Sequence, residues 1–301
     1  MSRETDRAPC VVELERQSCC KVNLLLNILG KRADGFHELE TVMHPVNLFD
    51  RLIFTRARQG IALTCGNPAL PIDSTNLVHR AATAFFKSAN LKEGIRIELE
   101  KNLPLAAGLG GGSANAATTL LGLNELFGDP LTVDRLHTIA VALGSDVPFF
   151  LQNRPALATG RGERIQALEF FGAMAGMAFL LIHPGFGIAT AWAYAQLPRF
   201  PLALKGQPHR AQKLISLLAG TDLKGASKEF YNSLEAPAFE KYPLLQLFKE
   251  FLLGNGAAAA LMSGSGSAVF ALVESPTAAE ALAEKFKNKF GKNNWIASAP
   301  I

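Results

Sequence analysis

The sequence predicts an α+β protein built from two layered domains, and two observations carry this prediction. Short β-branched or leucine-rich runs alternate with segments of helical apolar spacing through both halves of the chain. The 301 residues also exceed the size at which a single hydrophobic core usually stops growing. We therefore expect an N-terminal domain over residues 1–163 and a C-terminal domain over 164–301, joined near residues 160–166.

The first half begins with a strand and continues as strands and helices in alternation. "CCKVNLLLNIL" is rich in leucine and is followed by the turn-rich "GKRADGFHE", which indicates a strand that ends in a loop. "GIRIELE" alternates apolar and polar residues, which is typical of a half-buried strand. Thr132 and Gly144 suit the start and the end of a helix. The predicted elements are strands at 19–29, 50–57, 61–65 and 94–100, and helices at 75–89, from about Ser113, and at 132–144.

The second half has the same mixed character. The apolar run from Phe170 to Ile182 is too short for a transmembrane helix, which needs about 20 residues, and reads as a buried strand with its lead-in. "SGSGS" separates two apolar strands, and its simplest interpretation is a hairpin turn. Ser275 and Pro276 are typical of the start of a helix. The predicted elements are strands at 177–182, 257–262 and 268–273, and helices from about Thr190 and at 210–218, 244–253 and 275–290.

A glycine-rich loop follows the predicted strand at 94–100. "GLGGGS", Gly108 to Ser113, places flexible backbone where a helix begins, although glycine loses more entropy on folding than any other residue. Main-chain N–H groups at a helix start have no intrahelical partner and lie at the positive end of the helix dipole. An anionic phosphate satisfies both, and glycines let it approach closely. We therefore expect a phosphate-binding loop rather than a flexible connector.

Two common phosphate loops fit this stretch poorly. The P-loop ends in Gly-Lys-Ser/Thr, and the stretch contains no lysine. The dinucleotide fingerprint G-x-G-x-x-G begins well at Gly108 and Gly110, but Ser113 stands at the position of its third glycine. A dinucleotide-dependent oxidoreductase is therefore disfavoured.

The loop instead resembles the P-x-x-x-G-L-G-S/G-S/G-S-A signature of the GHMP kinase superfamily, and "LMSGSGSAVFAL" is similar to the third motif of that superfamily. The resemblance implies an N-terminal domain like the second domain of ribosomal protein S5 and a ferredoxin-like C-terminal domain, with the active site in the cleft between them. It also implies ATP as the phosphoryl donor. The residues expected at ATP are Pro104, Leu105, Ala106, Ala107, Gly108, Leu109, Gly110, Gly111, Gly112, Ser113, Ala114, Ser263, Gly264, Ser265 and Gly266.

The resemblance assigns the chemistry to Lys21 and Asp146. Taken alone, Lys21 would be a strand-edge residue with its head in water, and Asp146 a turn aspartate. By resemblance, Lys21 stabilises charge on the transferring phosphoryl group and Asp146 accepts the proton of the substrate hydroxyl. Mg²⁺ is implied because a triphosphate needs cationic neutralisation, and Ser113 is expected to touch the phosphate–metal assembly. The sequence contains no dedicated metal cage.

Three segments are similar to the superfamily members that phosphorylate the 2-hydroxyl of a cytidyl-diphosphate methylerythritol: "KVNLLLNILGKRADGFHELETV", "GSDVPFFL" and "ATGRGE". The residues expected to bind this alcohol are Asn23, Phe36, His37, Thr190 and Tyr194. Phe36 stands where these members usually have tyrosine, so stacking on cytosine is kept and a phenol hydrogen bond is lost. The alternatives are a superfamily kinase for homoserine or mevalonate, and a non-catalytic relative that senses a ligand.

Composition and charge limit the partners. The net charge of +4 falls short of the basic patch that nucleic-acid binding usually demands. The first residues mix acids and bases without the apolar core of a secretion signal. No C-x-x-C pair is formed by Cys10, Cys19, Cys20 or Cys65, which favours reduced thiols. We expect a cytoplasmic protein, monomeric or weakly homodimeric, that acts on a small molecule and has neither nucleic acid nor membrane as a partner.

Overall fold

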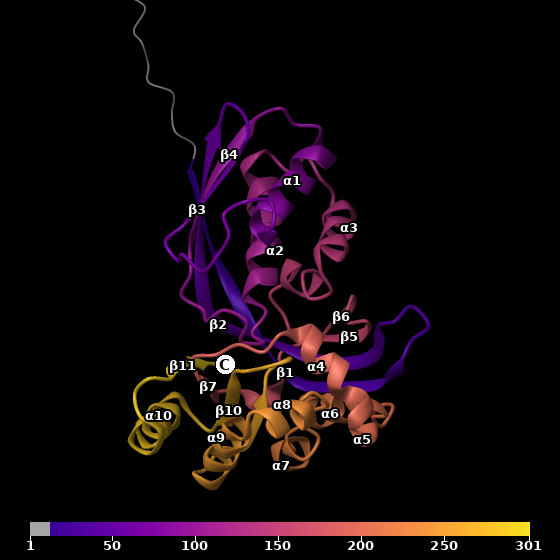
Figure 1. Ribbon diagram of the computed structural model, residues 1–301, viewed down its shortest axis with the longest axis vertical. Coiled ribbons are helices and arrows are strands. Elements are labelled where there is room, and N and C mark those ends of the chain that lie inside the picture. The colour runs from indigo at the N-terminus through magenta and orange to yellow at the C-terminus, as the bar shows by residue number, and fades with distance from the viewer. Residues whose placement is uncertain (1–12) are drawn as a thin grey trace, which may run out of the picture.

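The computed structural model describes residues 13–301, which form two β-sheets with helices packed against each (Figure 1). The larger, seven-stranded sheet has the order β3-β4-β2-β1-β8, and β5 joins it by pairing with both β2 and β6. The smaller sheet has the order β11-β7-β10-β9 and is antiparallel throughout. The strands are β1 (Glu13–Lys31), β2 (His37–Ala57), β3 (Ile61–Cys65), β4 (Gly94–Glu100), β5 (Ala156–Gly160), β6 (Arg164–Ala167), β7 (Ala178–His183), β8 (Tyr231–Asn232), β9 (Ala259–Met262), β10 (Val269–Val273) and β11 (Trp295–Pro300).

The two longest strands form one antiparallel hairpin that serves both layers. β1 and β2 pair from Glu13 opposite Thr55 to Lys31 opposite His37. The hairpin runs from the upper part of the molecule into the lower part (Figure 1), and β2 pairs first with β5 and then with β4 along its length. The register shifts at three places, one of them between Asn23 and Leu25. Such bulges bend a strand and re-aim its side chains.

Two helices, α1 (Leu77–Ala89) and α2 (Gly111–Leu126), cover the N-terminal part of the larger sheet, and α3 (Val133–Leu143) packs against both of them. Asn76 starts α1 by accepting the Val78 N–H at 2.8 Å. A Cβ on Gly122 would lie 2.8 Å from the Phe54 ring, so glycine lets α2 lie close to β2. This contact holds the C-terminal half of α2 against the sheet.

The smaller sheet is covered by α9 (Pro243–Gly254) and α10 (Pro276–Phe290). Phe248 of α9 and Phe286 of α10 meet edge to face with ring centroids 4.7 Å apart, a favourable aromatic geometry. The remaining helical segments are η1 (Pro148–Leu151), η2 (Gly172–Met174), α4 (Thr190–Gln196), η3 (Leu197–Arg199), α5 (Pro201–Leu204), α6 (Arg210–Ala219), α7 (Leu223–Ser227) and α8 (Glu235–Lys241).

Most elements predicted from the sequence are confirmed. The strand at 94–100 has the predicted bounds. Thr132 caps α3 by accepting the Arg135 N–H, and Gly144 ends this helix. Ser275 accepts the Ala278 N–H at 3.1 Å at the start of α10. The run at 170–182 forms η2 and the buried strand β7, as predicted.

Other expectations need correction. The loop predicted over "GKRADGFHE" is shorter, because β1 extends to Lys31 and β2 already begins at His37. The first part of β2 escapes prediction because residues 39–46 are buried on both faces and therefore show no alternation. The helix expected from Ser113 begins two residues earlier, at Gly111. The edge strand β11 was not predicted, since "WIASAP" is short and contains proline.

The division at residue 163 stays a prediction. Residue 164 begins β6, which pairs with β5, and β8 pairs with β1, so the larger sheet takes strands from both sides of that position. Within residues 13–301, no helix is long and apolar enough to cross a membrane. Cys19, Cys20 and Cys65 are free thiols, and burial raises the pKa of Cys19 to about 11, while Cys10 lies outside the described residues.

A buried histidine on β2 makes the stability of this fold depend on pH. The His44 ring lies among Phe170, Phe171 and Phe179, at centroid distances between 5.4 and 6.3 Å. Its Nδ1 donates to the Pro45 carbonyl at 2.7 Å, and its Nε2 has no hydrogen-bond partner in the described part of the chain. Burial lowers the pKa of His44 to about 4.

We expect the free energy of unfolding to fall as the pH is lowered from 6.5 to about 4, because the unfolded chain then binds a proton that folded His44 does not. The full effect amounts to at most about 3 kcal/mol. Urea unfolding in steps of pH measures it: His44→Gln should lose less stability over this interval than the wild-type chain. The exposed His137→Gln is the matched control, and equal slopes for wild type and His44→Gln would contradict the expectation.

Candidate active site

The glycine-rich loop runs from β4 to the start of α2 and has an unusual backbone. Ala106, Gly108 and Gly110 have positive φ angles of 50°, 76° and 72°. A Cβ on Gly108 would lie 2.0 Å from the Ser263 carbonyl oxygen, so another chain segment approaches the main chain here. Gly110 is the N-cap of α2, and the first helical bond runs from the Ala114 N–H to its carbonyl at 2.9 Å. The N–H groups of residues 111–113 precede that bond and lie at the positive end of the helix.

The segment that approaches Gly108 is the "SGSGS" turn between β9 and β10. The Ser263 hydroxyl donates to the Gly108 carbonyl at 3.0 Å, and the Ala268 N–H donates to the Ala107 carbonyl at 3.0 Å. Buried Asn232, on β8, donates to the carbonyls of Met262 and Gly264, each at 2.7 Å. The turn therefore joins two antiparallel strands, as its simplest interpretation predicted, and also holds the glycine-rich loop.

Lys21 lies beneath this loop, on β1. Its side chain is only 3% exposed, and its ammonium donates to the Asn23 Oδ1 at 2.5 Å and to the Gly108 carbonyl at 2.8 Å. The Asp146 Oδ2 lies 4.0 Å away. Burial lowers the pKa of Lys21, and the neighbouring Asp146 carboxylate opposes this change. An ammonium has three N–H groups, and these two bonds use two of them, so the third can point toward Asp146.

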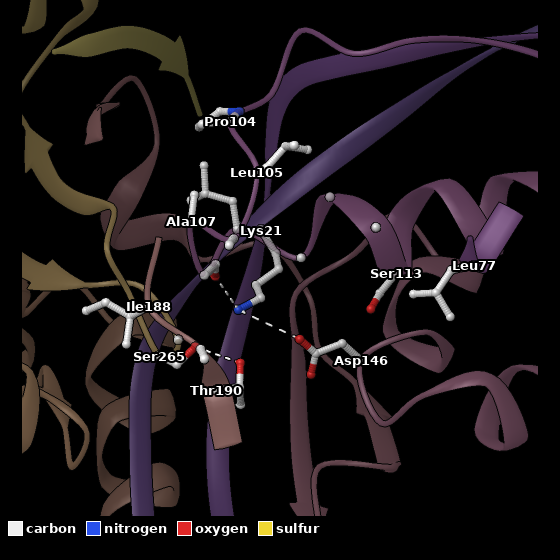
Figure 2. A pocket seen from close by; sticks show the side chains of 18 of the residues that line it. Lys21, Leu77, Pro104, Leu105, Ala107, Ser113, Asp146, Ile188, Thr190 and Ser265 are labelled. Atoms are coloured by element: carbon white, nitrogen blue, oxygen red, sulfur yellow. Dashed lines mark hydrogen bonds and ion pairs between the residues drawn. The ribbon is translucent and has the colours of Figure 1, made fainter. Parts of the chain in front are cut away.

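Asp146 stands at the turn between α3 and η1, and its side chain is 43% exposed. Figure 2 shows the Lys21 ammonium and the Asp146 carboxylate pointing toward one another, with the Ser113 hydroxyl on the same side. A buried cation and a solvent-reaching carboxylate thus face one space. The sequence prediction that these two residues belong together agrees with this placement.

Two cavities meet at this point. The first, about 620 Å³, is lined by Lys21, by Pro104 to Ser113, and by Gly264 and Ser265. The second, about 830 Å³, is lined by Phe36 and His37 from the hairpin end and by residues of α4. The residues that line both cavities are Leu39, Ser113, Asp146, Arg161, Thr190 and Tyr194. Two ligands bound side by side would therefore meet at Asp146.

Aromatic side chains gather at the second cavity. The rings of His37 and Tyr194 are tilted to one another with centroids 5.1 Å apart. Burial lowers the pKa of His37, and the positive charge of Lys31 adds to this effect, so the neutral imidazole is favoured. Burial raises the pKa of the Tyr194 hydroxyl, and the negative charge of Asp146 adds to this effect. The Phe36 ring is 50% exposed and lies 4.7 Å from the Arg161 guanidinium.

The structure brings most of the predicted site residues to the two cavities. Thr190 shares a hydrogen bond of 2.9 Å with Ser265, and both line the first cavity (Figure 2). Three predicted residues lie behind the lining: Ala114 is in the hydrophobic core, and Ser263 and Gly266 are buried in the turn. Asn23 lines the first cavity but also serves Lys21 directly.

Two features of the site escaped sequence reasoning. Buried Asp50 accepts the N–H groups of Asn102 and Leu103, each at 2.9 Å, and pairs with Lys101 and Asn115 below the glycine-rich loop. Nothing in "LFDRLIF" distinguishes this aspartate from one that ends a turn. Arg161 was noted only as part of "ATGRGE", although glycines on both sides are a signal of an exposed functional turn.

The described side chains around the first cavity could supply only some of the ligands that a divalent cation needs. Within residues 13–301, no group of three His, Cys, Asp or Glu side chains could hold a metal ion. The Ser113 hydroxyl supplies an oxygen atom at the wall of the first cavity. This fits Mg²⁺, which prefers oxygen ligands and usually keeps several waters beside substrate phosphates.

Comparison with known proteins supports the prediction from the sequence motifs. Residues 76–154 match the GHMP kinases N terminal domain, and residues 201–293 match the GHMP kinases C terminal domain. The chain is 40% identical over 280 residues to the 4-diphosphocytidyl-2-C-methyl-D-erythritol kinase of Syntrophotalea carbinolica, covering 93% of this chain and 95% of the relative. It is also 40% identical over 290 residues to the kinase of the same name from a Geobacter species, covering 95% and 98%.

Solved structures agree with these matches. A crystal structure of 4-(cytidine 5'-diphospho)-2C-methyl-D-erythritol kinase superposes with a TM-score of 0.77 at 34% identity, covering 96% of this chain and 100% of that one. Homoserine kinase from Cytophaga hutchinsonii shares the fold, with a TM-score of 0.76 at 20% identity, covering 100% and 96%. With a match in each half, close relatives along nearly its whole length and the predicted α+β fold confirmed, the chain belongs to the GHMP kinase family.

Proposed function

We propose that the chain transfers the γ-phosphoryl group of ATP to the 2-hydroxyl of 4-diphosphocytidyl-2-C-methyl-D-erythritol, a step of the non-mevalonate route to isoprenoid precursors. The observation that carries this proposal is the junction of two cavities at Lys21 and Asp146. A kinase needs two ligands whose reacting atoms meet, with a cation and a carboxylate at the meeting point. The relatives named above carry the substrate assignment.

The first cavity is the proposed ATP site. The N–H groups of residues 111–113 offer unpaired donors at the positive end of α2, where a triphosphate is stabilised. The loop from Pro104 to Ala114 would follow the phosphates, and the turn at residues 263–266 would close against it. The main-chain bonds between the two loops support this arrangement, since they fix the spacing of the donors before any ligand arrives.

Lys21 and Asp146 are the proposed catalytic residues. The Lys21 ammonium donates two of its three N–H groups to protein oxygens. The third, on the side of Asp146, would donate to the transferring phosphoryl oxygens and stabilise their charge. The Asp146 carboxylate, reachable from both cavities, would orient the substrate hydroxyl and accept its proton. Ser113 would touch Mg²⁺, which, when bound, neutralises charge on the triphosphate.

The second cavity is the proposed site of the cytidyl alcohol. Phe36 can stack on a pyrimidine, and the neutral His37 ring has one donor and one acceptor for its hydrogen-bonding edge. Tyr194 and Thr190 line both cavities and Asn23 lines the first beside Lys21, and the methylerythritol would bind among these three residues. We further propose a cytoplasmic enzyme, monomeric or weakly homodimeric, without a nucleic-acid or membrane partner.

A panel of alcohols tests the substrate. ADP release should be fastest with 4-diphosphocytidyl-2-C-methyl-D-erythritol, and homoserine and mevalonate should give little turnover because neither has a base to stack at Phe36. Coupled detection of ADP measures each rate. Preference for homoserine or mevalonate would favour another member of the family, and binding of ATP and alcohol without turnover would favour a ligand-sensing relative.

Removing either charge at the junction tests the mechanism. Asp146→Asn and Lys21→Ala should each lower kcat by roughly 10²–10⁴-fold, because each removes a group that acts in the transition state. Steady-state kinetics and thermal unfolding measure activity and folding together. The exposed Asp134→Asn and Lys92→Ala are matched controls that should keep wild-type kcat. Near-normal turnover in a folded junction variant would refute the role given to that residue.

Chelation tests the divalent cation. EDTA should abolish ADP release and excess Mg²⁺ should restore it, because the negative charge of the triphosphate needs a divalent cation to neutralise it. Titration of activity against free Mg²⁺ at fixed ATP gives the dependence. Full activity in EDTA, on protein freed of bound metal, would contradict this part of the proposal.

A further inference from the structure

Below the Lys21 ammonium lies a threonine to which the proposed mechanism gives no role. Thr41, on β2, is 4% exposed and lines the first cavity. Its Oγ1 lies 2.8 Å from the Asn23 Nδ2 and 2.5 Å from the Leu25 carbonyl oxygen. A hydroxyl thus connects the side chain that holds Lys21 to the main chain of the same strand.

Three hydrogen bonds connect Lys21, Asn23, Thr41 and the Leu25 carbonyl in series, and the first and last of these groups fix which atom donates in each bond. The Lys21 ammonium can only donate, so the Asn23 atom that faces it at 2.5 Å must be the oxygen. The Leu25 carbonyl can only accept, so it takes the single hydroxyl proton of Thr41. The Thr41 oxygen is then left as an acceptor, and the Asn23 amide group must point its NH₂ at it.

Flipping the Asn23 amide would disrupt both of its hydrogen bonds, the one to Lys21 and the one to Thr41. The NH₂ would meet the Lys21 ammonium, donor against donor, and the amide oxygen would meet a Thr41 oxygen whose proton is already used. Thr41 and Lys21 therefore both favour the same one of two orientations that are alike in shape and opposite in hydrogen bonding.

The β1–β2 register places the two side chains on one face of the sheet. Asn23 stands opposite Met43, and Thr41 is two residues from Met43 along β2, so Thr41 and Asn23 point the same way. The register shift between Asn23 and Leu25 inserts one residue into β1, so that Thr41 itself stands opposite Leu26. Both Asn23 and Thr41 line the first cavity.

We propose that Thr41 is a positioning residue that locks the Asn23 carbonyl oxygen onto Lys21 and so keeps the ammonium charged and aimed at the phosphoryl cavity. Its activity readout rests on the proposed kinase function. Thr41 itself touches neither reacting atom in this proposal. It acts through Asn23, which acts through Lys21.

The buried Lys21 ammonium depends on its hydrogen-bond acceptors to replace the water that it has lost. Burial already lowers the pKa of Lys21, with the Asp146 carboxylate acting against it. Without the Thr41 hydroxyl, the Asn23 Nδ2 loses its acceptor and only the ammonium holds the Asn23 amide in place, so the bond between them weakens. Weaker support of the charged form lowers the pKa of Lys21 further.

Thr41→Val removes the hydroxyl at nearly constant shape and tests the inference. We expect kcat to fall roughly 10–100-fold, in line with loss of a hydrogen bond to a charged group. The basic limb of the kcat–pH profile should move to lower pH, while the KM for ATP should change little. Thr41→Ser, which keeps the hydroxyl, should restore both. Thr119→Val is the matched control, because Thr119 is equally buried and bonds only within α2, and it should leave kcat unchanged.

A second readout needs no turnover. The ¹³Cε shift of Lys21, assigned with Lys21→Arg, should titrate at lower pH in Thr41→Val than in wild type or Thr41→Ser. This separates the two proposals: absence of turnover in wild type would defeat the proposed function, and an unchanged Lys21 titration would overturn the role of Thr41. A loss of kcat that is equal in Thr41→Val and Thr41→Ser, with no shift of the basic limb, would also overturn it. Should Thr41→Val not fold, Thr41→Ala carries the same comparison without the added methyl group.

Discussion

A lysine ammonium withdrawn from water is the constraint on which this site depends. Burying a charge is strongly unfavourable unless oxygen atoms replace the lost hydration. Lys21 finds these oxygens on three separate segments: Asn23 of its own strand, the Gly108 carbonyl of the glycine-rich loop, and Asp146 beyond α3. Each of these segments must therefore be held in place, and much of the surrounding structure serves that end.

One carbonyl connects the two halves of the site. The Gly108 oxygen accepts both the Lys21 ammonium at 2.8 Å and the Ser263 hydroxyl at 3.0 Å. The lysine comes from the first strand and the serine from the turn between β9 and β10, which Asn232 holds from below. A displacement of that turn changes the surroundings of the cation directly. The C-terminal part of the chain thus helps to hold the oxygen atom that Lys21 contacts.

The sequence predicted which residues gather at the candidate site better than it predicted the residues that support them. Lys21, Asp146 and the glycine-rich loop stand in motifs whose residue types and spacing are themselves the signal, and the structure brings them together. Thr41, Asp50 and Asn232 left no such signal, because a buried polar residue is identified by its partners, and those partners are distant along the chain. The first part of β2 was missed for a related reason, since a strand buried on both faces loses the alternation by which strands are found.

The β1–β2 hairpin has a consequence for how the site assembles. The bond between Asn23 and Thr41 joins residues 18 apart along the chain, whereas the bond from Lys21 to Gly108 joins residues 87 apart. Closing a short loop sacrifices less chain entropy than closing a long one, and sequence-local contacts form faster. Contact order therefore predicts that Lys21 and its nearest polar support form before the glycine-rich loop docks onto them.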